Sequence, residues 1–265
     1  MILALNVGNT HVGYGFVEDG RITSTGSAPT PPADRAFELE MAIDEALGRV
    51  QGADGALEIV VASVVPSATE ALRELATRRR WELLEATEDT VPMAKRLGAE
   101  GGAGNDRLIN AFAAWRLYGA PAIVVDLGTA TTFDVVDAGG GFLGGAIAPG
   151  VGLEIDALAT GTAQLPRVRI ALPPRAIGRN TTEAIQSGTV LGHVGMVEFL
   201  IRAISGELPS DGPAPMVILT GGLSSHTWAG AIHGVTAIDP LLTLRGLALM
   251  HQHYADARRA QPASA

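Results

Sequence analysis

The stretch that decides the fold is Ala122-Ile123-Val124-Val125-Asp126-Leu127-Gly128-Thr129-Ala130-Thr131-Thr132. It begins with an apolar run typical of a buried strand, and the glycine marks a tight turn. After the turn, Thr131, Phe133 and Val135 alternate with other residues, which predicts a second strand. Turn residues at 137–140 then predict a third strand. The segment therefore predicts a meander of three antiparallel strands.

The same layout occurs near the start of the chain. An apolar run at 2–5 leads into Asn6-Val7-Gly8-Asn9-Thr10, and a second turn follows at Asp19-Gly20. Asn6 corresponds to Asp126 and Gly8 to Gly128, an offset of 120 residues in both cases. A repeat of this size predicts two similar domains, which we place at residues 1–117 and 118–265.

Helical and strand patterns follow each meander, so the fold class is α/β. Apolar residues recur at helical spacing in several segments, and short apolar runs predict two further strands. The expected helices are 35–50, 67–77, 106–117, 183–204 and a terminal helix from Asp239-Pro240 to about 258, and the strands are 59–65 and 217–219.

Composition excludes several classes of function. The net charge is −9, so the chain has no basic surface for nucleic acid. Cysteine is absent, which excludes disulfides, Cys-ligated zinc and thiol catalysis. The chain starts directly with a strand-like run, and its most apolar stretches are broken before the roughly 20 residues of a membrane span. These features predict a cytoplasmic protein without a membrane segment.

Two turns have the composition of phosphate-binding loops. In Asn6-Val7-Gly8-Asn9-Thr10, small side chains leave backbone N–H groups open to phosphate oxygens, although an ordinary hairpin turn has the same composition. The second copy, 126–132, adds a carboxylate and three threonine hydroxyls, so the pair predicts a clamp for a polyphosphate. No Walker sequence competes for this role, because the only lysine is Lys95.

Two further motifs are ambiguous by themselves. Gly101-Gly102-Ala103-Gly104-Asn105-Asp106-Arg107 leads a glycine-rich loop into a helix, where Asp106 is either a functional carboxylate or a plain helix cap. Thr220-Gly221-Gly222 follows a buried strand and would let a ring or sugar approach the backbone. A simple strand-to-helix turn explains the second motif equally well.

These motifs, in this order, resemble the type III pantothenate kinases of the acetate and sugar kinase, Hsp70 and actin superfamily. The resemblance runs nearly end to end. It rests on Asn6 to Thr10, on Gly104-Asn105-Asp106-Arg107 and on Asp126 to Thr132. Lesser matches are Ser63-Val64-Val65-Pro66, Gly178-Arg179-Asn180-Thr181, Thr220-Gly221-Gly222-Leu223 and Leu242-Thr243-Leu244-Arg245-Gly246-Leu247.

The resemblance implies two actin-like, ribonuclease H-like domains with ATP in the cleft between them and pantothenate as phosphate acceptor. Asp106 would be the general base, and Gly104, Asn105 and Arg107 would bind the substrate. Thr181 would reach the substrate across a homodimer interface. Gly188, Gly192 and Gly195 would permit a close approach of two helices, in the dimer or within one chain.

The same resemblance implies the nucleotide and metal contacts. ATP would bind with Mg²⁺, and Asp126 would be a ligand of a monovalent cation, potassium or ammonium. The ATP-binding positions implied are Asn6, Val7, Gly8, Asn9, Thr10, His11, Val12, Gly13, Thr129, Gly221 and Gly222.

Two positions depart from the family pattern. The family has Asp where this chain has Asn6, beside the metal and the transferred phosphate, and often Tyr where an ungapped count gives Leu97. Losing one preorganised electrostatic group typically costs roughly 10²–10³ in turnover. Two alternatives therefore accompany the kinase interpretation: a catalytically impaired or regulatory homologue, and a kinase for another small alcohol.

Overall fold

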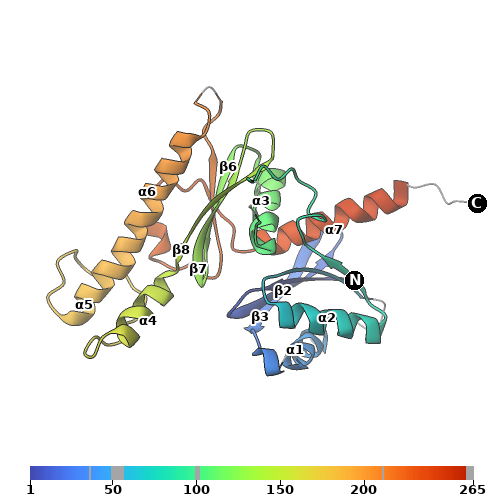
Figure 1. Ribbon diagram of the computed structural model, residues 1–265, viewed down its shortest axis with the longest axis horizontal. Coiled ribbons are helices and arrows are strands. Elements are labelled where there is room, and N and C mark those ends of the chain that lie inside the picture. Colours follow the sequence, from blue (N-terminus) through green and yellow to red (C-terminus); the bar gives the residue numbers. More distant parts are fainter. Residues whose placement is uncertain (36, 49–56, 99–101, 211, 261–265) are drawn as a thin grey trace, which may run out of the picture. The chain divides into compact units, whose positions relative to one another are not determined.

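The computed structural model describes residues 1–35, 37–48, 57–98, 102–210 and 212–260. The chain forms two compact units, which we call unit 1 and unit 2. Unit 1 comprises Met1–Ala113 together with Leu242–Ala265, and unit 2 comprises Ala114–Leu241. Each unit is built around one mixed sheet (Figure 1).

The sheet of unit 1 has the strand order β3-β2-β1-β4-β5. Its central strand β1 pairs antiparallel with β2 and parallel with β4. The antiparallel part is the predicted meander, and the parallel part follows a helical crossover. The strands are β1 (Ile2–Val7), β2 (His11–Glu18), β3 (Arg21–Pro29), β4 (Glu58–Ser63) and β5 (Glu82–Glu85).

The sheet of unit 2 repeats this topology, with the order β10-β9-β6-β7-β8. Strand β6 takes the place of β1, since it pairs antiparallel with β7 and parallel with β9. The predicted duplication is thereby confirmed. The strands are β6 (Ala122–Leu127), β7 (Ala130–Val136), β8 (Phe142–Pro149), β9 (Met216–Thr220) and β10 (Ala237–Ile238).

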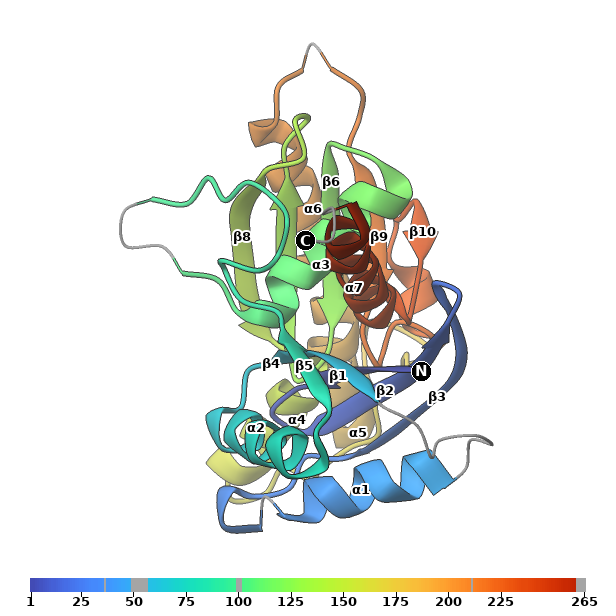
Figure 2. The same cartoon turned by 90° about the vertical axis from the view of Figure 1, so that its right-hand side faces the viewer.

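The helices of unit 1 cover both faces of its sheet (Figure 2). Helices α1 (Phe37–Gly48) and α2 (Pro66–Arg79) bury leucines and isoleucines against one face. The terminal helix α7 (Leu242–Ala260) lies against the other face, where Leu244 approaches Gly15 of β2. Helix α3 (Asn105–Tyr118) contains the division between the units.

The contacts divide the chain differently from the boundary expected at residue 117. Helix α7 groups with unit 1 because it packs on β1, β2, β3 and β4. The boundary at 117/118 stays a prediction about the two repeated segments. Helix α4 (Val151–Gly161) and strand β5 were not predicted, and the expected end of the first helix at Val50 lies outside the described residues.

Unit 2 buries one face of its sheet under α4 and a long helical segment. This segment runs through α5 (Thr181–Gln186), a π-helical stretch at Ser187–Leu191 and α6 (Gly192–Glu207). Within residues 181–207, an 18-residue window has a mean hydropathy of 1.3, so by length and composition alone this helix could span a membrane, which the expectation of interrupted apolar stretches did not foresee. Val190, Val197 and Ile201 nevertheless pack in the core of unit 2, as in a helix of a globular domain.

Candidate functional site

In unit 1, the loop after β1 is held from both sides and leaves its tip open. The Gly8 N–H donates to the His11 carbonyl (3.0 Å), and the Thr30 hydroxyl donates to the Gly8 carbonyl (2.6 Å). The side chains of Asn9 and Thr10 at the tip are exposed. The backbone at this tip is therefore fixed in place and accessible, as a phosphate-binding loop requires.

The side chains of Asn6 and its neighbours on β1 alternate between the two faces of the sheet. Leu3, Leu5 and Val7 pack in the core with α1 and α2, so Asn6 points to the opposite face. The Val12 side chain belongs to the core, and any contact of Val12 with a ligand would be made by its backbone.

The start of α3 lies at the same edge of the sheet as this loop. The Asn105 side-chain amide donates to the Ser63 carbonyl at the end of β4 (3.1 Å). Ser63 is in register with Val7, the last residue of β1. The structure thus brings Gly104, Asn105 and the loop after β1 to the carboxyl ends of two parallel strands, where α/β sheets usually bind ligands.

Asp106 is half-buried beside Gly104. A Cβ atom on Gly104 would lie 2.7 Å from Asp106 Oδ1, so only glycine leaves this carboxylate its space. Burial raises the pKa of Asp106, while the hydrogen bond from the Arg107 N–H (2.8 Å) and the nearby Arg107 charge oppose the rise. A carboxylate with a raised pKa suits a general base better than one held in a salt bridge.

In unit 2, the equivalent loop is closed by two backbone hydrogen bonds. The Gly128 N–H donates to the Ala130 carbonyl, and the Gly150 N–H donates to the Thr129 carbonyl, each at 3.0 Å. A Cβ on Gly150 would lie 2.4 Å from the Gly128 and Thr129 carbonyl oxygens, so Gly150 allows the loop to pack directly on the start of α4.

The three threonines of this loop have different environments, which corrects the expectation of a joint cluster. Thr129 is exposed at the tip. The Thr131 side chain is buried, and its hydroxyl lies 3.0 Å from His193 Nε2. The Thr132 hydroxyl donates to Asp134 (3.5 Å). Only Thr129 can present its hydroxyl to a ligand at the loop tip, because side chains of successive strand residues point to opposite faces.

Asp126 lies at the end of β6 beside Thr220, its register partner on β9. The Thr220 hydroxyl is buried and has no hydrogen-bond partner in the described part of the chain. Gly221 follows with φ +90°, and a Cβ there would lie 2.3 Å from Asp126 Oδ1. A carboxylate next to an unpaired hydroxyl oxygen is a donor set that fits a hard cation.

Thr181 lies elsewhere in unit 2, as the exposed first residue of α5. Asn180 caps this helix by accepting the Glu183 N–H (2.9 Å), and Glu183 accepts the Arg179 N–H in return. The helix start adjoins an open cavity of about 550 Å³. Its lining residues are Leu158, Leu165, Gly178, Arg179, Asn180, Thr181, Ala184, Ile185 and Gly188.

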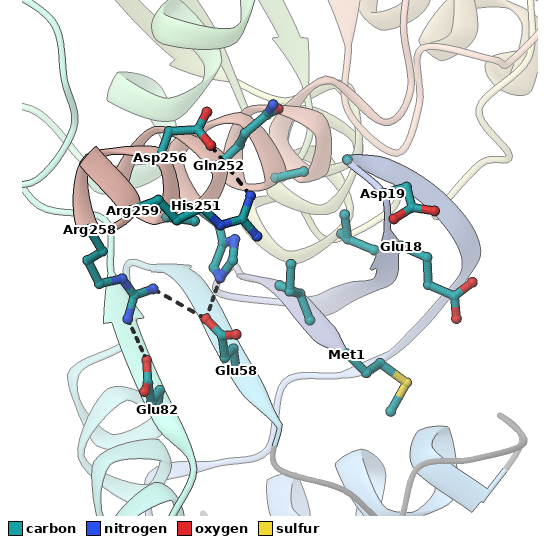
Figure 3. Close-up of a pocket in the computed structure, with 15 residues that line it drawn as sticks. Met1, Glu18, Asp19, Glu58, Glu82, His251, Gln252, Asp256, Arg258 and Arg259 are labelled. Carbon is teal, nitrogen blue, oxygen red and sulfur yellow. Dashed lines mark hydrogen bonds and ion pairs between the residues drawn. The ribbon is translucent and has the colours of Figure 1, made fainter. Parts of the chain in front are cut away.

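A larger cavity of about 670 Å³ lies at the opposite end of the unit 1 sheet (Figure 3). Ion pairs occupy its wall: His251 bonds Glu58 (2.6 Å), and Arg258 bridges Glu58 and Glu82. None of the predicted site residues lines it. Within unit 1, the loop after β1 and Asp106 define the candidate site better than this cavity does, because they lie at the carboxyl ends of the parallel strands.

No cluster of three or more His, Asp or Glu side chains in the described ranges could hold a metal alone. A divalent metal here would need substrate phosphates among its ligands, as Mg²⁺ in nucleotide sites commonly has. The residues that sequence patterns did not reveal are His193 and Glu154, which are bonded to each other at 2.9 Å. A lone His in an apolar helix carries no signal of such a contact.

The two sheets of equal strand order define a duplicated, actin-like α/β fold. Solved structures of low sequence identity share this fold. A conserved protein of the Baf family from Campylobacter jejuni has a TM-score of 0.62 at 17% identity, covering 96% of this chain and 99% of that one. A ROK family glucokinase from Streptomyces griseus, solved with glucose and AMPPNP, has a TM-score of 0.50 at 16% identity over 95% and 99%.

The chain belongs to the type III pantothenate kinase family. The family model matches residues 2–203. The type III pantothenate kinase of Acidothermus cellulolyticus is 39% identical over 259 residues, which cover 95% of this chain and 98% of that protein.

Proposed function

We propose that this chain transfers the γ-phosphate of ATP to the primary hydroxyl of pantothenate, giving 4'-phosphopantothenate and ADP in the first step of coenzyme A synthesis. The observation that carries the proposal is family membership over nearly the whole chain. The position and raised pKa of Asp106 support it.

In this proposal Asp106 accepts the proton of the attacking hydroxyl. The hydroxyl oxygen forms a bond to the γ-phosphorus as the bond to the β,γ-bridging oxygen breaks, and ADP leaves with that oxygen. Gly104 leaves space at the carboxylate, Asn105 fixes the helix start to β4, and Arg107 places a positive charge beside the reacting groups. Since phosphoryl transfer depends mainly on positioning and electrostatics, these contacts are the main contribution of unit 1.

ATP is held by the residues predicted for it, with the open loop tips at Asn9 and Thr129 nearest the phosphates. Mg²⁺ would neutralise phosphate charge when bound, and Asn6 would face it with an amide oxygen in place of a carboxylate. The proposal places the enzyme in the cytoplasm, where ATP is available.

A monovalent cation, K⁺ or NH₄⁺, is proposed beside Asp126. The unpaired, buried Thr220 hydroxyl supports this assignment, because a buried oxygen without a partner costs free energy that a cation would recover. Asp126 would offset the cation charge.

A homodimer is also proposed, with α6 at the interface and Thr181 reaching the partner's substrate. Gly188, Gly192 and Gly195 are exposed, and, apart from the neighbouring residues and the backbone of the same helix, no described atom lies within 4 Å of a Cβ built on them. Phe199 continues this stripe and is 61% exposed. Within unit 2, this geometry favours the dimer over a contact between two helices of the same unit.

The test is an ADP-release assay with purified protein, ATP, Mg²⁺ and pantothenate, with and without K⁺ or NH₄⁺. Formation of 4'-phosphopantothenate, checked by mass spectrometry, is expected. A panel of other small alcohols tests the alternative acceptor suggested by Leu97. ADP release with another alcohol and none with pantothenate would replace the proposed substrate.

One specific feature favours a second candidate, a catalytically impaired or regulatory homologue. Asn6 stands where the family has Asp, at the strand end beside the phosphate loop. Binding of ATP and pantothenate in calorimetry, without product in the assay above, would establish this alternative.

A further inference from the structure

A chain of three side chains, of which Thr131 and His193 are buried and Glu154 is partly exposed, runs through unit 2 behind the loop after β6. The Thr131 hydroxyl lies 3.0 Å from His193 Nε2, and His193 Nδ1 lies 2.9 Å from Glu154 Oε1. Thr131 and His193 are each 1% exposed, and the edge of Trp228 packs on the imidazole at 5.8 Å between ring centres. We call this chain the His193 relay.

The donor and acceptor groups determine the direction of each hydrogen bond in the relay. A carboxylate can only accept, so His193 Nδ1 carries the proton that faces Glu154. In the neutral imidazole, Nε2 then accepts the proton of the Thr131 hydroxyl. Substrate cannot reach a threonine buried to this extent, so the arrangement is not a hydrolytic triad, despite its order of hydroxyl, imidazole and carboxylate.

The two ends of the relay attach to opposite sides of one loop. Thr131 is the second residue of β7, directly after Ala130, whose carbonyl closes the turn with Gly128. Glu154 is in the first turn of α4, and its N–H donates to the carbonyl of Gly150 (3.1 Å). The Gly150 N–H in turn donates to the Thr129 carbonyl. His193 therefore ties together the two elements between which Gly128 and Thr129 are held.

The helix that carries His193 is adapted to this position. The π-helical stretch Ser187–Leu191 ends two residues before it and accommodates one extra residue in the helix. Thr189, Val190, His193, Val194 and Val197 are all buried, so the imidazole lies on the core face.

We propose that His193 is a positioning residue that holds the loop after β6 in the geometry that receives the phosphates of ATP. The inference rests on the proposed function. His193 does not touch substrate. It acts through Thr131 and Glu154 on the backbone at Gly128 and Thr129, and its loss should therefore affect the nucleotide more than the acceptor.

Three variants test the proposal. His193→Phe keeps an aromatic ring beside Trp228 and removes both hydrogen bonds. His193→Gln can keep both, because an amide has one donor and one acceptor with nearly the spacing of the two imidazole nitrogens. His251→Phe is the matched control, since His251 is also a buried imidazole bonded to a glutamate, Glu58, but belongs to unit 1, where Glu58 is in register with Ile2 at the start of β1.

The first measurement needs neither ligand nor activity. Hydrogen–deuterium exchange of the Gly128 and Gly150 amides should accelerate about tenfold in His193→Phe, because buried groups lose their partners and the loop opens more often. His193→Gln should stay within about threefold of the parent, since it keeps both bonds. His251→Phe should leave these two amides unchanged after correction for global stability.

The second measurement compares the KM for ATP with the KM for pantothenate in each variant. His193→Phe should raise the KM for ATP about tenfold and leave that for pantothenate within about twofold. Three results would each overturn the proposal. The first is an equal change in the KM for ATP and the KM for pantothenate in His193→Phe. The others are an effect of His251→Phe as large as that of His193→Phe, and unchanged exchange at Gly128 and Gly150 in His193→Phe. If the parent does not phosphorylate pantothenate, the proposed function fails, while exchange and calorimetric titration with ADP still decide the role of His193.

Discussion

Units 1 and 2 repeat one strand order but differ at the helix that follows each sheet. In unit 1, Asp106 in the first turn of α3 is half-buried and has a raised pKa. In unit 2, Asp239 before α7 accepts the Tyr118 hydroxyl (3.0 Å) and the Leu241 N–H (3.1 Å). The two units therefore share a strand order, whereas the carboxylate of Asp106 is half-buried with a raised pKa and that of Asp239 is held by two hydrogen bonds.

The largest expected effect tests this contrast. Asp106→Asn should lower turnover by roughly 10²–10⁴, the usual contribution of a general base. Because its pKa is raised in the folded state, ionised Asp106 disfavours folding as the pH rises through that pKa, so the variant should be at least as stable as the parent at neutral pH. Kinetics and thermal unfolding measure the two effects.

Asp239→Asn supplies the opposite outcome, namely a lower melting temperature with a much smaller loss of turnover per molecule of folded protein.

The pH dependence of the parent enzyme tests Asp106 in a second way. The rate should fall at acid pH, through a pKa above the usual aspartate value, as Asp106 becomes protonated. Parental turnover in Asp106→Asn would remove Asp106 from catalysis.

The next effect concerns the equivalent strand ends, Asn6 in unit 1 and Asp126 in unit 2. Asn6→Asp should raise turnover by up to about 10² and lower the Mg²⁺ needed, because it restores a charge at nearly constant side-chain volume. Steady-state kinetics across a Mg²⁺ titration measure this. A fast parent enzyme that the substitution slows would show that the site is built around the amide.

A smaller effect separates two adjacent glycines in unit 2. Gly221→Ala should lower the free energy of unfolding by about 1–3 kcal/mol, because φ is +90° and the new Cβ would collide with Asp126. Gly222→Ala is the control, since, apart from its two chain neighbours, no described atom lies within 4 Å of a Cβ built on Gly222. Denaturant unfolding compares the two, and equal losses would contradict the role of close approach.

The smallest expected effect is a change in cation dependence. Asp126→Ala should reduce activation by K⁺ or NH₄⁺ about tenfold, because it removes the charged ligand of a hard cation. Asp156→Ala is the control. Asp156 is on α4 and pairs with Arg167 at the surface, so its loss should leave cation dependence unchanged. An unaltered potassium titration in Asp126→Ala would exclude Asp126 from the site.

Local pattern was sufficient for the two meanders, strands β4 and β9, most helices and the family. Strand alternation, helical spacing and turn residues act over a few positions, so they can be read without a structure. The offset between Asn6 and Asp126 predicted two equal meanders, and the strand orders agree with it. The helix predicted at 106–117 is α3, which extends it by one residue at each end.

Only the tertiary structure decided which polar side chains meet. The raised pKa of Asp106 depends on burial, and the inward turn of Thr131 depends on the face of β7 that the core covers. His193 meets residues 62 and 39 positions away, and α7 returns to the first sheet. Such contacts arise from packing between distant segments, and periodicity within one segment carries no record of them.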